Sequence, residues 1–157
     1  MPDADPLSPA ALARRILDAN AYLTLATADA RGRPWATPVW FADRGSREFV
    51  WVSRVGRRHS QNLAERPEAA IAVFDSTTPV GAATAVFADA IAGEVPDDEL
   101  DDALAVFNAR TIAAGRDAWP AERVRGDAAL RLYRAVASAV WILDEDEHRV
   151  PVPVPVP

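Results

Sequence analysis

The sequence predicts a mainly β domain, in which six or seven antiparallel strands form a small barrel with flanking helices. Three observations indicate this class. Apolar and β-branched residues fall into short runs, turns containing Gly or Pro separate most of these runs, and helical periodicity is confined to two or three segments. The length of 157 residues suits one domain, which we expect to span 1–149 and to be followed by a Pro-Val tail at 150–157.

The first half of the chain predicts one helix and a meander of three strands. Ser8 is a typical N-cap and Pro9 a typical first helical residue, so we expect a helix over about 9–20. The segments that follow are rich in β-forming residues, and Gly and Pro punctuate the turns between them. We therefore expect strands over 21–29, 35–43 and 48–53.

Two further helices are predicted in the second half. The polar segment 56–66 is anchored by Leu63 and stopped by Pro67, so it predicts a short helix. The acidic run EVPDDELDD at 94–102 places carboxylates where the positive end of a helix dipole favours them. It predicts a helix over about 97–114, which Gly115 would end.

The remaining segments predict four more strands, of which the second is bulged near 90–93. Their ranges are 68–76, 83–95, 129–138 and 139–146. The last residues, 150–157, alternate Val and Pro. Because every second residue there lacks a backbone N–H donor, this end forms either a polyproline-like tail or an edge segment of the sheet.

Composition and charge argue against several classes of function. The formal net charge of -6 disfavours binding to nucleic acid or to an anionic membrane surface, both of which favour basic proteins. The chain has no cysteine, and all 17 basic residues are arginine, so thiolate and lysine chemistry are missing. With two histidines we expect no histidine-based metal site. We find no signal peptide and no apolar run of membrane-spanning length, and expect a cytoplasmic protein.

One short stretch, SRVGRRHSQNL at 53–63, is basic although the protein is acidic. Its basic side chains are Arg54, Arg57, Arg58 and His59. They lie where a predicted strand leads into a predicted helix, and a helix N-terminus favours an anion rather than cations. A bound phosphate would compensate them. The alternative is a solvated arginine face that pairs with carboxylates such as Glu65 and Glu68.

The order of these segments resembles that of the pyridoxamine 5'-phosphate oxidase-like split-barrel superfamily, whose members bind FMN. In that superfamily a Gly-x-Pro turn leads into a strand along the flavin, the next strand ends in a small hydroxyl residue, and a basic pair opens a short helix. The residues at those places here are Gly32 and Pro34, Ser53, Arg57, Arg58 and His59, Leu63, and Arg66 and Pro67. The resemblance covers about 20–95 well and the C-terminal strands loosely.

The resemblance implies where the cofactor would lie. Thr37, Pro38, Val39 and Trp40 would line the isoalloxazine ring, Val52 and Ser53 would lie near the ribityl-phosphate side, and Arg57, Arg58 and His59 would hold the phosphate. It also implies a homodimer with the cofactor near the interface. The expected activity is transfer of hydride or electrons through flavin N5 to or from a small-molecule substrate.

Departures from the family pattern bear on the activity. His59 replaces the family's lysine, and Ala85 stands where many oxidases carry a glutamine that touches the flavin. The arginine- and histidine-rich C-terminal pattern of pyridoxamine phosphate oxidases is also missing. We therefore expect an FMN-dependent oxidoreductase with a different substrate, and we assign no catalytic residue.

Two alternatives on the same fold stay open. A deazaflavin-dependent reductase would use the same basic turn for its cofactor's phosphate, and would need further basic groups for that cofactor's acidic tail. A non-enzymatic flavin- or haem-binding protein, acting as a sensor or store, is the other alternative.

Several aromatic residues fall near the expected cofactor. Trp35, Trp40 and Trp51 would stack on the ring, fill the barrel core or form a dimer interface. Tyr133 and Trp141, on the late strands, are interpreted as packing residues or as a cover for the flavin of a partner subunit.

A hydrolytic triad is a further reading of the same region. Ser53 or Ser60 would be the nucleophile, with His59 as base and Asp75 as its partner. No strand–Ser–helix elbow accompanies these residues, so the sequence disfavours this reading.

Overall fold

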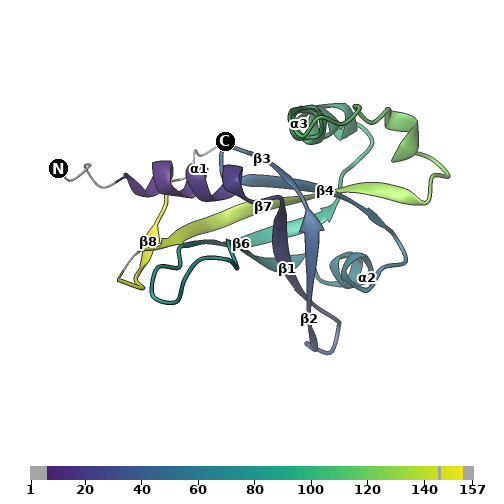
Figure 1. Ribbon diagram of the computed structural model, residues 1–157. Helices are drawn as coiled ribbons and strands as arrows, with labels where there is room; N and C mark the ends of the chain where they lie inside the picture. Colours follow the sequence, from purple (N-terminus) through teal and green to yellow (C-terminus); the bar gives the residue numbers. More distant parts are fainter. Residues whose placement is uncertain (1–6, 145, 154–157) are drawn as a thin grey trace.

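One antiparallel sheet makes up most of the molecule and curls around an apolar core (Figure 1). The computed structural model describes residues 7–144 and 146–153. The strands are β1 (Tyr22–Ala28), β2 (Pro34–Trp40), β3 (Ala42–Arg44), β4 (Glu48–Arg54), β5 (Glu68–Phe74), β6 (Ala85–Glu94), β7 (Leu130–Leu143) and β8 (Arg149–Pro151). The helices are α1 (Pro9–Ala19), α2 (Arg58–Glu65) and α3 (Leu100–Ala113), with a 3-10 turn, η1 (Ala121–Arg123).

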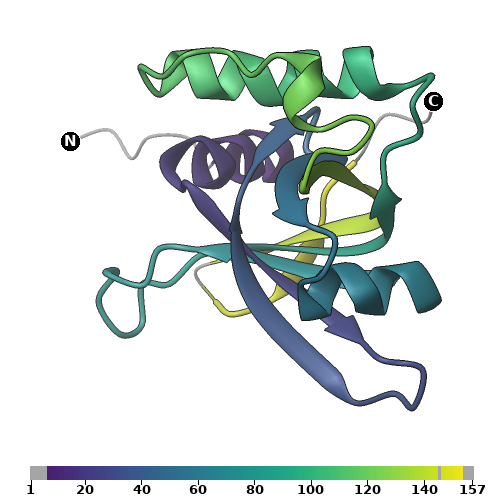
Figure 2. The same ribbon diagram turned by 90° about the vertical axis from the view of Figure 1, so that its right-hand side faces the viewer.

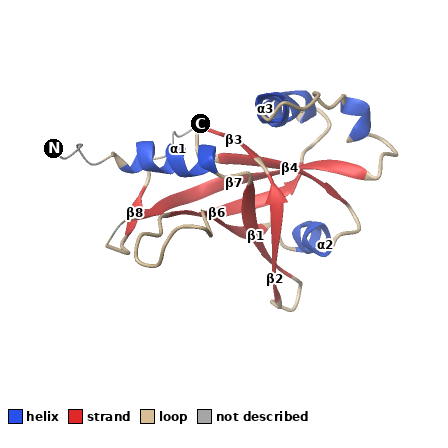
Figure 3. Cartoon of the chain, in the orientation of Figure 1, coloured by secondary structure: helices blue, strands red, loops and turns tan. Residues whose placement is uncertain are grey.

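The eight strands of the described residues follow the spatial order β2-β1-β5-β6-β7-β4-β3, with β8 paired to one end of β7. Strands dominate the molecule and the helices lie around the sheet, as Figure 3 shows. The predicted antiparallel split barrel is confirmed. It has one more strand than the upper prediction, because two three-residue strands, β3 and β8, form at its edges while two predicted strands join into one, β7.

The three predicted helices are present. The Ser8 hydroxyl accepts the backbone N–H of Ala11 at 3.2 Å, so α1 begins as its N-cap predicts. Helix α3 starts later than predicted, at Leu100, because the preceding acidic residues form a turn in which the Glu99 N–H donates to the Pro96 carbonyl. Asp101 and Asp102 still lie in its first turn, where the helix dipole favours them.

The strand predicted over 35–43 is wrong as a single unit, because the chain changes partners at Phe41. Before this residue β2 pairs with β1, and after it β3 pairs with β4. The Phe41 side chain is fully buried in the core, and its N–H donates to the Ala21 carbonyl at 3.3 Å. A continuous apolar run therefore spans two different edges of the sheet.

The separate strands predicted over 129–138 and 139–146 are also wrong, because they form the single long strand β7. The pairing register with β6 shifts by one residue between Asp89 and Ala90, and the additional residue is Ser138 of β7. The Ser138 hydroxyl donates to the Asp89 carbonyl at 3.2 Å. This bulge bends the strand without ending it. The predicted irregularity near 90–93 therefore has its extra residue in the neighbouring strand.

Part of the Pro-Val segment belongs to the sheet. Strand β8 pairs antiparallel with the end of β7, and the Val152 N–H donates to the Val140 carbonyl at 2.8 Å. The Val152 side chain is buried in the main core. The first residues of this segment thus form the edge segment that was one of the two predictions, and 154–157 lie outside the described residues.

Two apolar cores hold the molecule together. The larger one fills the barrel and is covered by α1 through Ala13, Ile16 and Leu17. The second lies between α3 and the outer side of β4, where Leu104 and Phe107 pack in one cluster with Val50. Because this second core holds α3 against the sheet, the helix and the loop after it form a wall beside the open part of the barrel.

Helix α2 is anchored to the barrel by one buried hydrogen bond and one leucine. The Asn62 side-chain amide donates to the Thr27 hydroxyl of β1 at 3.0 Å, and both side chains are buried. Leu63 joins the main core. These contacts set the position of the N-terminus of α2, which carries the predicted basic cluster.

We expect Asn62→Ala to lower the free energy of unfolding by about 1–3 kcal/mol, because it leaves the buried Thr27 hydroxyl without its donor. Urea denaturation followed by circular dichroism measures this change. Gln61→Ala, on the exposed side of the same helix, is the control and is expected to change stability by less than about 0.5 kcal/mol. Equal losses in the two variants would contradict the anchoring role of Asn62.

Candidate functional site

The barrel is open between β2 and β4. Strand β2 pairs with β1 on one side only, and residues 51–54 of β4 pair only with β7. The described residues thus leave two strand edges whose backbone groups have no partner strand. Pro38 lies in the middle of β2, which is compatible with such an edge because proline lacks an N–H donor.

A cavity of about 980 Å³ lies at this opening. It is bounded on one side by β2, the end of β4 and the start of α2, and on the other by α3 and the loop that follows it. In the views of Figures 1 and 2, α3 and α2 lie on opposite sides of this end of the sheet. The volume is at the upper end of the range typical of small-molecule sites, roughly 300–1,000 Å³.

All nine residues predicted to bind a cofactor line this one cavity. Thr37, Pro38, Val39 and Trp40 come from β2, Val52 and Ser53 from β4, and Arg57, Arg58 and His59 from the start of α2. The structure therefore brings together residues that are far apart in sequence. Their role in holding a cofactor stays a prediction.

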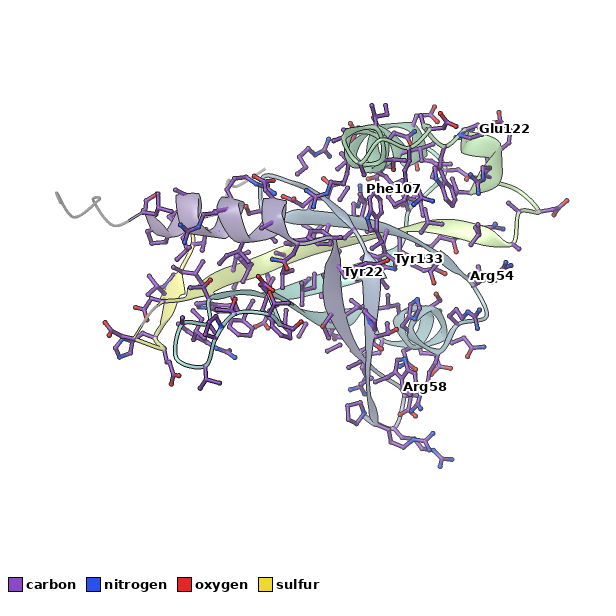
Figure 4. The ribbon with its side chains drawn as sticks, viewed as in Figure 1. Tyr22, Arg54, Arg58, Phe107, Glu122 and Tyr133 are labelled. Carbon is purple, nitrogen blue, oxygen red and sulfur yellow. The ribbon has the colours of Figure 1, made fainter. Side chains whose placement is uncertain are left out.

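The start of α2 is a candidate anion site. Arg57 is the N-cap residue, and no side chain caps the helix. Neither Arg57 nor Arg58 forms an ion pair with a carboxylate of residues 7–144 and 146–153, so the alternative of pairing with Glu65 or Glu68 finds no support there. The Arg58 guanidinium lies 4.5 Å from the ring centre of Trp35, beside β2 (Figure 4).

His59 is buried and hydrogen-bonded to Ser53. Its Nε2 lies 2.7 Å from the Ser53 hydroxyl, and both side chains are buried. Burial, and to a smaller degree the charge of Arg57, lower the pKa of His59 below its usual value. At neutral pH the imidazole is therefore uncharged, and the cluster carries its positive charge on the arginines.

The hydrolytic triad is not assembled. Asp75 accepts hydrogen bonds from the backbone N–H and the hydroxyl of Thr77 at 2.8 and 2.6 Å, in the turn after β5. Ser53 and His59 form a pair without a third member, since no carboxylate among the described residues is bonded to His59.

The three tryptophans near the expected cofactor have different surroundings. Trp51 is fully buried in the main core, where its ring stacks on that of Tyr133 with 5.9 Å between centroids. Trp35 and Trp40 line the cavity, and Trp40 contacts Phe107 of α3 edge to face at 5.1 Å. Burial raises the pKa of Tyr133, which is a core residue in this structure.

The sequence analysis missed the far side of the cavity. We call it the α3 wall, and its residues are Phe107, Thr111, Arg116, Asp117, Trp119 and Arg123. The sequence patterns predict no role for residues 116–123, although a tryptophan between two arginines in a proline-containing loop is a usable signal. What the linear order did not reveal is that this loop folds back toward β2. Figure 4 shows Phe107 on the side of α3 that faces the sheet.

The described residues hold neither a cluster of metal ligands nor a helix that could span a membrane. No group of three or more His, Asp or Glu side chains there lies close enough together to hold a metal ion. No helix among residues 7–144 and 146–153 combines the length and the apolar character needed to span a membrane.

Comparison with solved structures shows the same fold in several proteins of low sequence identity. A haem-binding protein from Mycobacterium smegmatis is 23% identical, with a TM-score of 0.74 over 95% of this chain and 59% of that one. HutZ, a haem storage protein from Vibrio cholerae, is 22% identical, with a TM-score of 0.65 over 86% and 95% of the two chains. An F420 reductase is 22% identical, with a TM-score of 0.57 over 81% and 94%.

These identities show the fold alone, and this chain spans only 59% of the length of the mycobacterial protein. A search of the curated proteins found no match. The family model of pyridoxamine 5'-phosphate oxidase, however, matches residues 10–143, which include every strand from β1 to β7. The chain therefore belongs to the pyridoxamine 5'-phosphate oxidase family.

Proposed function

We propose that the cavity binds a flavin-type cofactor, FMN or a deazaflavin, through its phosphate, and that the protein is an oxidoreductase. One observation carries this proposal. Two arginines with no carboxylate partner among the described residues lie at an uncapped helix N-terminus that opens into the cavity. Such an arrangement favours a phosphate ester because free N–H groups and guanidinium groups converge on the same place.

The expected binding energy is sufficient. An arginine–phosphate contact at ~4 Å, with an effective dielectric constant near ~20, contributes roughly 4 kcal/mol before desolvation costs. Micromolar affinity requires about 8 kcal/mol. Arg57 and Arg58, together with the backbone N–H groups of the first turn, therefore supply enough attraction for a phosphorylated ligand.

The ring of the cofactor would lie along β2. The free edge of this strand offers backbone donors and acceptors, and Trp40 and Val52 offer apolar surface. Once bound, the flavin would supply hydride or electron transfer. The chain's part is to hold the phosphate, to position the ring and to exclude water. No side chain is assigned as a general acid or base, since the uncharged His59 is already bonded to Ser53.

A deazaflavin fits the same site. Its acidic tail needs basic groups beyond the α2 cluster, and Arg116 and Arg123 of the α3 wall line the same cavity. The structural similarity to an F420 reductase adds support. FMN and a deazaflavin are therefore two forms of one proposal, which the absorption spectrum separates.

Haem binding is the second candidate function. It is favoured by the structural similarity to two proteins described as haem-binding and haem storage proteins. His59 is the one histidine that lines the cavity among the described residues, and its uncharged imidazole suits an iron ligand. To ligate iron through Nε2, however, His59 would have to give up its 2.7 Å bond to Ser53, which is why we place this candidate second.

We also propose that the protein is a homodimer. The outward face of the sheet carries exposed apolar side chains, among them Ile91 of β6 and Val136 of β7, which lie directly opposite each other in the pairing register. Phe74 of β5 is a further exposed apolar side chain of the same sheet. Exposed apolar side chains that lie side by side, as Ile91 and Val136 do, are typical of a surface that another chain covers.

The absorption spectrum of the purified protein, after incubation with FMN, deazaflavin cofactor or haemin and gel filtration, tests the proposed function. We expect flavin's two bands or the single violet band of a deazaflavin, and reduction of the bound cofactor by a nicotinamide donor. A sharp Soret band, without the flavin bands and without the deazaflavin band, would favour the haem-binding candidate. If none of the three cofactors is retained, the proposed function is wrong.

Arg58→Ala is expected to weaken FMN binding by about 1.5–3 kcal/mol, because it removes a charge-assisted hydrogen bond to the phosphate. Fluorescence titration of FMN measures the affinity. Arg54→Ala is the matched control, since Arg54 is exposed, lies close in sequence and does not line the cavity. A similar loss in both variants would point to a general charge effect and would remove Arg58 from the phosphate site.

Ile91→Glu is expected to convert a dimer into a monomer, because it buries a charge in the proposed interface. Size-exclusion chromatography with light scattering measures the mass. Ile112→Glu places the same charge on an apolar residue of similar exposure on α3, outside this face, and should leave the mass unchanged. A monomeric wild-type protein would refute the dimer proposal.

A further inference from the structure

The α3 wall is a preformed surface rather than a loose loop. The Asn108 side chain of α3 makes two hydrogen bonds to the backbone of Trp119, donating to its carbonyl at 2.9 Å and accepting from its N–H at 2.8 Å. Gly115 has a φ of +72°, which favours glycine and lets the chain reverse at the end of α3. Val124 is buried in the second core and anchors the other end of the loop.

Three aromatic rings and one guanidinium form a continuous chain of contacts that runs from β2 along this wall. Trp40 of β2 contacts Phe107 at 5.1 Å, and Phe107 contacts Trp119 at 5.7 Å, both edge to face. The Arg123 guanidinium lies 3.7 Å from the ring centre of Trp119. Because a stacked guanidinium uses its face, its N–H groups stay available at the edge for a planar, two-oxygen acceptor.

The cavity is positive although the protein is acidic. Four arginines and one aspartate line it, namely Arg57, Arg58, Arg116, Arg123 and Asp117. Neither Arg116 nor Arg123 forms an ion pair with a carboxylate in the part of the chain that the structure describes. The positive charge is divided between two places, the start of α2 and the α3 wall.

We propose that the α3 wall is a substrate subsite for an aromatic carboxylate. Arg116 and Arg123 would bind the carboxylate, and the accessible parts of Trp119 and Trp40 would contact the ring, with the buried Phe107 in contact with both tryptophans. This inference rests on the proposed function, because it assigns the α2 side of the cavity to the cofactor. It adds what the proposed function leaves open, which is the chemical class of the substrate.

The carboxylates of a deazaflavin's acidic tail share this chemistry. Such a tail would use the two arginines but would leave the aromatic rings beside them without a ligand. The position of Arg123 on the ring of Trp119 links the charged and the aromatic parts of the wall, and therefore favours a ligand that has both parts.

Isothermal titration calorimetry of the 157-residue protein with 2-naphthoate tests this proposal, with 2-naphthamide and triglutamate as comparison ligands. We expect 2-naphthoate to bind at least about tenfold more tightly than either, because only it combines the ring and the charge. Arg123→Gln and Arg116→Gln should each weaken the affinity for 2-naphthoate about tenfold. Arg125→Gln removes the same charge two residues away, where Arg125 pairs with Asp101, and should leave the affinity unchanged.

Three results with FMN-free protein would overturn the proposal. They are no saturable binding of 2-naphthoate, equal losses in Arg123→Gln and Arg125→Gln, and tighter binding of triglutamate than of 2-naphthoate. Binding of 2-naphthoate to FMN-saturated protein is also expected, and direct competition between the two would assign the wall to the cofactor instead. Failure of the proposed function has a different signature: FMN does not bind, while 2-naphthoate still binds in an Arg123-dependent way.

Discussion

The crossing of the chain at Phe41 determines the shape of the site. β2 and β3 are the two ends of the strand order, yet they are consecutive in sequence and joined by this single buried residue. The two ends of the sheet are therefore joined by a covalent link and not by a ladder of hydrogen bonds between β2 and β4. On one side of this link the two strand edges diverge, and the cavity lies between them.

An unclosed barrel has a cost, because free strand edges expose backbone groups and invite unwanted pairing. In this protein one side of the opening is covered by α2 and the other by α3. Each helix is held by its own contacts, α2 by the Asn62–Thr27 bond and α3 by the second core. The two walls are thus independently anchored to one sheet, and the site has a rigid frame although it lies at a gap in the fold.

The arginines of the protein fall into two groups, those paired with carboxylates and those that line the cavity. Several arginines are used for structure, and the clearest case is Arg14, whose two terminal nitrogens donate to the carboxylate of Asp43 at 2.6 and 2.7 Å. This contact ties α1 to β3, and it raises the pKa of Arg14. The arginines of the cavity have no such partner among the described residues. A net charge of -6 is therefore compatible with a local site for anions, because charge balance is decided within a few ångströms and is screened beyond about 10 Å.

By itself, the sequence determined the local features of this protein. Ser8 and Pro9 start α1, the Gly-x-Pro turn separates β1 from β2, and the basic residues before Gln61 lie at the start of a helix, since each of these depends on neighbours in the chain. The nine residues predicted from the family resemblance also lie together. Only the tertiary structure decided where strands change partners, as at Phe41 and Ser138, because pairing depends on which edge is free and not on the alternation of side chains. It also decided that the loop carrying Trp119 faces β2. That placement results from the packing of α3 on the sheet and from the hydrogen bonds between Asn108 and Trp119. No pattern in the linear sequence indicates that these two residues are partners.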